Sequence, residues 1–170
     1  MAEFRLVQYD PAVVYKGIKS FDCGNEMINR FVQKSLKKRI KNHLSQAYIL
    51  LDTAHHEQFS GFYTLDTFAI AREQFESDKR PSGLPPVVPV VKLGMLGVDK
   101  KFQGQGIGKR LLRDSFLKTA EIAKIAGCTG MFLLVEKEAV AFYESLGFFR
   151  LKESDPLPMF LPIDQILATL

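Results

Sequence analysis

Residues 98–112 of the chain read VDKKFQGQGIGKRLL. An apolar, strand-like run ends at Val98, a polar loop with glycines at 104, 106 and 108 follows, and a strongly helical segment comes next. The first N–H groups of a helix have no intrahelical acceptor, and the helix dipole favours negative charge beside them. The stretch therefore predicts an anion site, with phosphate as its natural ligand.

Two nucleotide-binding motifs do not fit this loop. A dinucleotide GxGxxG motif counted from Gly104 places Lys109 where the last glycine should stand. A P-loop fails because Arg110 follows Lys109 and the upstream glycine is absent. The pattern QxxGxG does fit, at Gln103, Gly106 and Gly108, and it resembles the acyl-CoA pyrophosphate loop of GNAT-type N-acetyltransferases. A plain glycine-rich turn is the alternative interpretation.

Composition predicts a single domain spanning residues 1–170. The chain is 46% hydrophobic with a formal charge of +4, and it contains neither a signal-peptide pattern nor an apolar run of membrane-spanning length. We therefore expect a cytoplasmic protein without a membrane partner. Cys23 and Cys128 are expected to be reduced thiols. No metal is expected, since the adjacent His55 and His56 cannot easily face one ion.

Apolar spacing and turn residues predict a mixed α/β chain. A helix is expected from about Asn25 to Asn42, with Asp22 as its N-cap and a break near Gln33. The other expected helices cover 109–126 and 139–146. Strands are expected at 4–10, 47–52, 61–71, 90–98 and 131–135, with a last one through 159–161, and residues 74–89 are expected to form a long loop.

A second motif, AVAFYESLGF at 139–148, strengthens the family resemblance. It is similar to the GNAT signature in which a helix carrying Phe-Tyr ends at Gly-Phe, in the right order and at the right separation after the glycine loop. With SFDCGNEMINRF near the start and PPVVPVVKLGMLGVD before the loop, the chain resembles the GNAT toxins of bacterial toxin–antitoxin pairs. It departs from them at Met95, where that subfamily commonly has arginine.

This resemblance implies a fold and its partners. The fold would be a GNAT acyltransferase domain whose central, mostly antiparallel sheet is splayed at the acetyl-CoA site and flanked by helices. Acetyl-CoA would be the donor, no metal would be needed, and the acceptor would be aminoacyl-tRNA. A ribbon-helix-helix antitoxin and a homodimer are implied as well.

The resemblance also implies site residues. Tyr143 would protonate the departing CoA thiolate, and backbone N–H groups near Leu96 to Val98 would stabilise the oxyanion. An ordinary tyrosine at the edge of the core is the alternative for Tyr143. The expected acetyl-CoA contacts are Leu96, Gly97, Val98, Gln103, Gly104, Gln105, Gly106, Ile107, Gly108, Lys109 and Phe142.

Charge placement agrees with a tRNA acceptor. No Asp or Glu occurs between Met27 and Leu51, whereas six cations fall in one helical region. Such a run is typical of a phosphate-binding face and equally of a solvated helix face. The candidate tRNA-binding residues are Arg30, Lys34, Lys37, Lys38, Arg39, Lys41 and Lys92, with Lys79 and Arg80 as possible extensions of the same patch.

The strand before the loop, 90–98, contains no carboxylate to serve as a general base. A lysine amine with a pKa near 10.4 needs a base, whereas an α-amino group starts near 7.7–8.0. The absence therefore favours aminoacyl-tRNA, although Asp66, Glu136 or Glu138 could reach the site. Two other functions stay open: acetylation of a small amine or protein, and a non-catalytic acyl-CoA-binding or nucleic-acid-binding regulator on the same fold.

Overall fold

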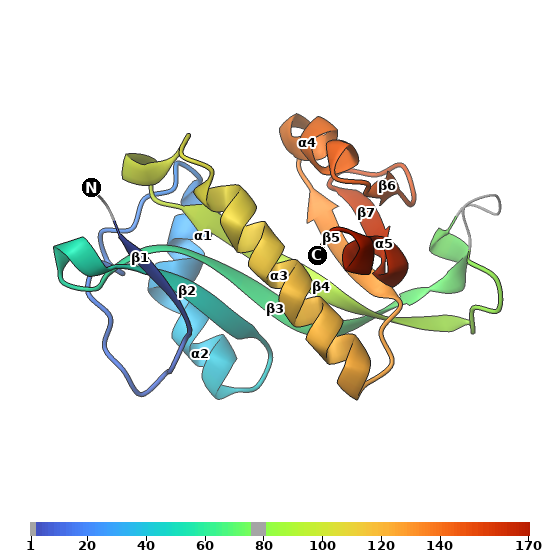
Figure 1. Cartoon of the computed structure of the whole chain (residues 1–170), viewed down its shortest axis with the longest axis horizontal. Coiled ribbons are helices and arrows are strands. Elements are labelled where there is room, and N and C mark those ends of the chain that lie inside the picture. Colours follow the sequence, from blue (N-terminus) through green and yellow to red (C-terminus); the bar gives the residue numbers. More distant parts are fainter. Residues whose placement is uncertain (1–2, 76–80) are drawn as a thin grey trace. The chain divides into compact units, whose positions relative to one another are not determined.

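The computed structural model describes residues 3–75 and 81–170 (Figure 1). Seven strands form one sheet in the order β1-β2-β3-β4-β5-β7-β6. The chain divides into two compact units, residues 1–66 with 95–114 and residues 67–94 with 115–170. The expected mixed α/β fold with helices flanking a sheet is confirmed.

The first unit begins with an antiparallel meander. β1 (Phe4–Gln8) pairs with β2 (Gln46–Asp52), and β2 pairs with β3 (Gln58–Ala71). Alternate side chains point to opposite faces of these strands. Phe21, Phe59 and Phe62 meet edge-to-face or tilted in the core on one side, with ring centroids 5.2–5.9 Å apart.

One long helical segment covers that core. It runs through α1 (Glu26–Arg30), a π-helical stretch at Phe31–Ser35 and α2 (Leu36–Lys41). Apolar residues recur every four positions at Ile28, Val32, Leu36 and Ile40. A four-residue spacing drifts by about 40° per step around an ideal α-helix of 3.6 residues per turn. The wider π-helical turn corrects this drift, so Val32, Leu36 and Ile40 are all buried.

The same unit contains the end of β4 (Val87–Val98), the glycine loop (residues 103–108) and the start of α3 (Ile107–Ile125). Gly61 and Gly97 permit close packing here. A Cβ at Gly61 would lie 3.2 Å from the carbonyl oxygen of Gly97, and one at Gly97 would lie 3.1 Å from Cγ2 of Ile28. Gly97 therefore makes room for α1 beside β4.

The second unit is built around β5 (Gly130–Val135). β5 pairs in parallel with the first part of β4, at Val91 and Lys92, and antiparallel with β7 (Leu157–Pro162). β6 (Phe149–Arg150) pairs antiparallel with β7. This unit also contains α4 (Val140–Ser145), α5 (Ile163–Ala168), the part of α3 from residue 115 onwards, and two 3-10 turns, Arg72–Gln74 and Lys137–Ala139. The expected predominance of antiparallel pairing is confirmed.

The expected N-cap at Asp22 is wrong. Asn25 caps α1, because its side chain accepts hydrogen bonds from the N–H groups of Met27 and Ile28. The expected break near Gln33 is confirmed as the π-helical stretch.

Several strand boundaries also differ from expectation. β3 and β4 begin earlier than expected, at Gln58 and Val87, so the expected loop 74–89 is shorter. Lys79 and Arg80 lie outside the described residues. Among the helices of the described residues, none is long and apolar enough to cross a bilayer.

Candidate functional site

A pocket of about 300 Å³ opens at the glycine loop, within the first unit. Its walls come from three segments: the end of β4, the glycine loop with the start of α3, and a turn before α1. The lining residues are Cys23, Asn25, Ile28, Leu96, Gly97, Val98, Phe102, Gln103, Gly104, Gly106, Ile107 and Gly108. The glycine loop therefore borders a concave part of the surface.

Backbone conformation explains two of the loop glycines. Gly104 and Gly106 have φ values of +80° and +79°, a region that residues with a Cβ rarely adopt. Gly108 lies in the first turn of α3, where an added Cβ would meet no atom within 4 Å. Because α3 starts at Ile107, its first N–H groups have no intrahelical acceptor and can bind an anion.

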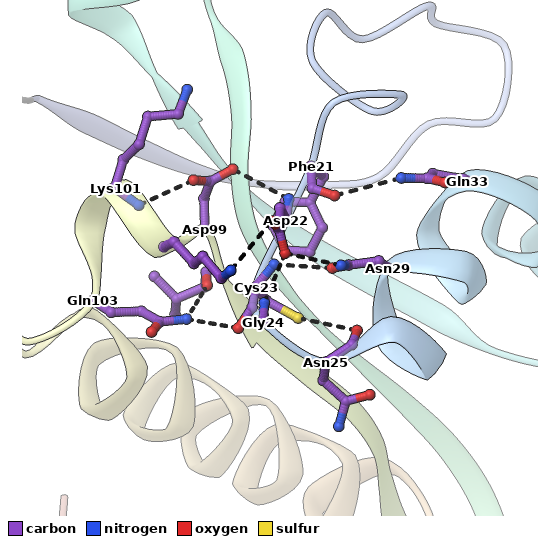
Figure 2. A network of polar contacts seen from close by, with 12 residues as sticks. Phe21, Asp22, Cys23, Gly24, Asn25, Asn29, Gln33, Asp99, Lys101 and Gln103 are labelled. Atoms are coloured by element: carbon purple, nitrogen blue, oxygen red, sulfur yellow. Dashed lines mark hydrogen bonds and ion pairs between the residues drawn. The ribbon is translucent and has the colours of Figure 1, made fainter.

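Gln103 is an exposed residue, but its side chain is hydrogen-bonded to two backbone carbonyls. Its Nε2 donates to the carbonyl oxygen of Cys23 at 2.8 Å and to that of Val98 at 2.9 Å (Figure 2). One carboxamide thus ties the glycine loop both to the end of β4 and to the segment before α1. Neither hydrogen of this carboxamide is therefore left for a phosphate, and the backbone N–H of Gln103 donates to the carbonyl oxygen of Lys100 at 3.4 Å.

The segment tied by Gln103 is a tight polar turn, residues 22–25, which we call the donor turn. Asp22 Oδ1 accepts from the N–H of Gly24 at 2.9 Å and from Nδ2 of Asn29 at 3.0 Å, while Asn29 Oδ1 accepts from the N–H of Cys23 at 2.9 Å (Figure 2). The Gly24 and Asn29 bonds lower the pKa of Asp22 below its usual value. The carboxylate therefore stays ionised at neutral pH.

Two further contacts balance negative charge beside the pocket. Lys100 Nζ lies 3.5 Å from Asp22 Oδ2, and the buried Asp99 carboxylate accepts from the N–H of Lys101 at 3.1 Å. Burial raises the pKa of the Cys23 thiol, so this pocket-lining group is uncharged at neutral pH. The pocket walls are therefore compatible with an anionic ligand.

Most of the predicted donor-site residues line this pocket, but three do not. Gln105 and Lys109 are exposed and stand outside its lining, and Phe142 belongs to the second unit. The sequence analysis missed Cys23, Asn25, Ile28 and Phe102. The DCGN string at 22–25 was the available signal, but local pattern does not reveal a contact between segments so far apart in the chain.

Tyr143 lies on α4 in the second unit. Its ring packs edge-to-face between Phe142 and Phe148, with centroid distances of 5.2 and 5.4 Å. Burial raises the pKa of the Tyr143 phenol above its usual value of 10.0. The hydroxyl is therefore protonated at neutral pH and is able to donate a proton.

A row of lysines follows the long helical segment. Lys34, Lys37, Lys38 and Lys41 line one recess of about 410 Å³, whose floor includes Tyr9, Ile18 and Val32. Arg30 is exposed one turn before Lys34. We call Lys34, Lys37, Lys38 and Lys41 the lysine row.

Arg39 and Lys92 differ from the row. Arg39 Nε donates to Ser45 Oγ at 3.0 Å, and its guanidinium lies 3.7 Å from Asp66 Oδ2, so it faces the protein. Lys92 belongs to the second unit, where its Nζ lies 4.9 Å from the centre of the Phe68 ring. The lysine row is thus the part of the predicted basic patch that gathers in one place.

The alternative general bases are dispersed. Asp66 faces Arg39, and Glu136 and Glu138 are exposed in the second unit. His55 Nδ1 lies 2.7 Å from Asp52 Oδ2, so this histidine has a carboxylate partner. In the described ranges 3–75 and 81–170, no group of three or more His, Cys, Asp or Glu side chains is placed to hold a metal ion.

Known proteins share both the sequence pattern and the fold. Residues 67–149 match the family model of the acetyltransferase (GNAT) domain. A tRNA-acetylating toxin of Mycobacterium tuberculosis is 29% identical over 145 residues, which cover 85% of this chain and 84% of that protein. A probable toxin TacT of Sinorhizobium fredii is 30% identical over 159 residues, covering 86% and 85% of the two chains.

Two solved structures extend the comparison. AtaT complexed with acetyl-methionyl-tRNAfMet has a TM-score of 0.89 at 28% identity, covering 98% of this chain and 99% of that one. A tyrosine-to-phenylalanine variant of AtaT, bound to the C-terminus of the antitoxin AtaR and acetyl-CoA, has a TM-score of 0.83 at 26% identity, covering 98% and 97%.

Proposed function

This chain belongs to the GNAT acetyltransferase family, and we propose that it is a toxin that acetylates the α-amino group of aminoacyl-tRNA and so blocks translation. It is an N-acetyltransferase that uses acetyl-CoA as donor. The observation that carries the acceptor assignment is the lysine row, because four cations lining one recess suit a polyanionic acceptor. Two relatives support aminoacyl-tRNA as the acceptor: the tRNA-acetylating toxin of Mycobacterium tuberculosis, and AtaT, which was solved with acetyl-methionyl-tRNAfMet.

The donor would bind through the glycine loop. Its pyrophosphate would meet the first N–H groups of α3, where Gly106 and Gly108 leave the backbone bare. The thioester carbonyl would lie against Leu96 to Val98, which line the same pocket. Backbone N–H groups there would stabilise the oxyanion that forms when the amine attacks.

The reaction needs a neutral amine and a protonated leaving group. The amine nitrogen forms a bond to the acetyl carbon, the oxyanion collapses, and the carbon–sulfur bond breaks. Tyr143 would give its proton to the departing thiolate, because its raised pKa keeps the phenol protonated. The proton that the nitrogen loses on becoming an amide would pass to water, and the Tyr143 phenolate would take up a proton from water in turn. β4 carries no carboxylate to act as base, and an α-amino group near pKa 8 supplies neutral amine without one.

One experiment separates this function from its alternatives. The protein is incubated with radiolabelled acetyl-CoA and total charged tRNA, with uncharged tRNA as the control. Label on charged tRNA but not on uncharged tRNA is the expected result. Label on proteins or small amines instead would favour the other acetyltransferase activities, and no label anywhere would favour an acyl-CoA-binding or nucleic-acid-binding regulator.

Three further assignments complete the proposal. The protein acts in the cytoplasm, where aminoacyl-tRNA is found, as a homodimer held inactive by a ribbon-helix-helix antitoxin. A solved relative bound to the C-terminus of its antitoxin supports the antitoxin partner. Light scattering of the purified protein tests the dimer: a monomer mass at micromolar concentration would contradict it.

A further inference from the structure

The donor turn lies outside the residues that match the family model, yet it forms one wall of the pocket. Cys23 and Val98 are far apart in sequence, and their carbonyl oxygens share a single donor group, the Gln103 carboxamide. Both hydrogens of Nε2 are thus used to join the two segments. We propose that Gln103 and the donor turn are a positioning device for the acetyl-CoA pyrophosphate, a role that rests on acetyl-CoA binding in this pocket.

The electrostatic reason is local. A carbonyl oxygen is the negative end of a dipole, and two of them beside an anion pocket would repel phosphate oxygens if left unpaired. The Gln103 carboxamide donates a hydrogen bond to each of these two carbonyl oxygens, so the groups left for the ligand are N–H donors. A glutamate of the same length would face both carbonyls with a carboxylate. Donation to both carbonyl oxygens therefore requires the side-chain amide of glutamine at position 103 and not the carboxylate of glutamate.

The donor turn holds this arrangement from the other side. The N–H of Gly24 belongs to the same peptide group as the Cys23 carbonyl that Gln103 binds, and it donates to Asp22 Oδ1. Asn29, which is buried, holds this arrangement by donating to Asp22 and accepting from the N–H of Cys23. The N–H of Lys100 donates to the Asp22 carbonyl oxygen at 2.8 Å, and the N–H of Asp99 donates to that of Ser60 at 2.9 Å. The start of the segment between β4 and the glycine loop is thus anchored to β3 and to the donor turn.

The test compares two exposed glutamines. Gln103→Met removes the donor group without adding charge, and Gln165→Met makes the same change on α5 in the second unit, outside the pocket lining. We expect Gln103→Met to raise KM for acetyl-CoA about tenfold, because two carbonyl acceptors, one of them partly buried, lose their donor. KM for charged tRNA and kcat at saturating acetyl-CoA should stay within about twofold, since neither depends on pyrophosphate placement.

Hydrogen exchange gives a second readout. In Gln103→Met, faster exchange should be confined to peptides covering residues 22–29 and 98–108, whereas a general loss of stability would speed exchange throughout. Equal KM values for the two methionine variants, or equal changes in both KM values and kcat, would overturn the proposal. If wild-type protein showed no heat of binding with acetyl-CoA, the proposed donor pocket itself would be wrong.

A milder variant, Asp22→Asn, tests the proposal even if the Gln103→Met protein does not fold. Asp22→Asn keeps an acceptor for the N–H of Gly24 and loses the ion pair with Lys100 at a half-exposed site. It should raise KM for acetyl-CoA by about threefold, because the turn is loosened rather than released. An unchanged KM in this variant, together with a Gln103→Met protein that fails to melt cooperatively, would also overturn the proposal.

Discussion

The glycine loop and the lysine row belong to the same compact unit and are proposed phosphate sites of two different kinds. The loop offers backbone groups, because it consists of two glycines with positive φ and the start of a helix. The carboxamide of Gln103 holds this loop in place through its hydrogen bonds. The row is made of exposed, flexible side chains along one helical segment. A site built from backbone groups restricts which residue types its positions tolerate. A site built from charged side chains requires little more of its residues than a positive charge.

The largest effect should come from a group that belongs to neither site. Tyr143→Phe removes only a hydroxyl and should lower kcat by about 10²- to 10⁴-fold, the usual worth of a general acid. Binding of acetyl-CoA and of tRNA should persist, which would separate chemistry from both phosphate sites. Tyr15→Phe is the control, since it also deletes one hydroxyl. Unchanged acetylation by Tyr143→Phe would remove Tyr143 from the reaction.

The same tyrosine predicts a pH dependence. Its folded-state pKa is raised, so the stability it contributes is fully present below the unfolded value of 10.0 and is lost as pH rises above it. Between pH 7 and 9 the phenol stays protonated, and the rate should rise as the acceptor amine loses its proton. A rate that fell across this range would contradict a phenolic acid.

Two alanine variants would sharpen the view of the loop as a backbone site. Gly106→Ala should destabilise the free protein by about 1–2 kcal/mol, because its φ is +79°. Gly108→Ala should stabilise it by up to about 1 kcal/mol, because Gly108 is helical and has open space around it. Both should weaken acetyl-CoA binding. Melting curves and calorimetry would show opposite signs for stability and the same sign for affinity.

The lysine row should respond to salt where the loop does not. The double variant Lys34→Ala with Lys38→Ala should reduce the slope of log K against log salt for tRNA binding by about 1.5, from two lost phosphate contacts. The control is Lys124→Ala with Lys152→Ala, which removes the same charge from two exposed lysines of the second unit. Equal slopes in the two double variants would mean that tRNA binding depends on the net charge of the protein and not on the position of these lysines.

The smallest effect should come from Arg39. Arg39→Ala should leave the salt slope unchanged, because Ser45 and Asp66 already engage its guanidinium. A partly exposed ion pair is worth about 0–1 kcal/mol, so the melting temperature should fall only slightly. A clear drop in the salt slope would place Arg39 in the phosphate-binding row after all.

What the sequence predicts and what it misses depends on how each site is built. The glycine loop could be predicted because a positive φ and an exposed backbone both favour glycine, which is visible in the sequence. The pocket wall at Cys23, Asn25 and Ile28 could not, since its contacts join distant segments through a glutamine side chain. The sequence groups Arg39 with the lysines, because periodicity places a residue on a helix face but does not reveal a carboxylate, here Asp66, on strand β3.

The π-helical stretch at Phe31–Ser35 has a geometric consequence for the lysine row. Lys34 and Lys38, like Lys37 and Lys41, are four residues apart, a step of about 6 Å along a helix axis. On a uniform α-helix the second lysine of each pair would be rotated by about 40° from the first. The π-helical stretch contains Lys34 and reduces this rotation for Lys34 and Lys38, whereas Lys37 and Lys41 both lie in α2 and keep it. The first pair is therefore the one that lies closer to a line parallel to the helix axis.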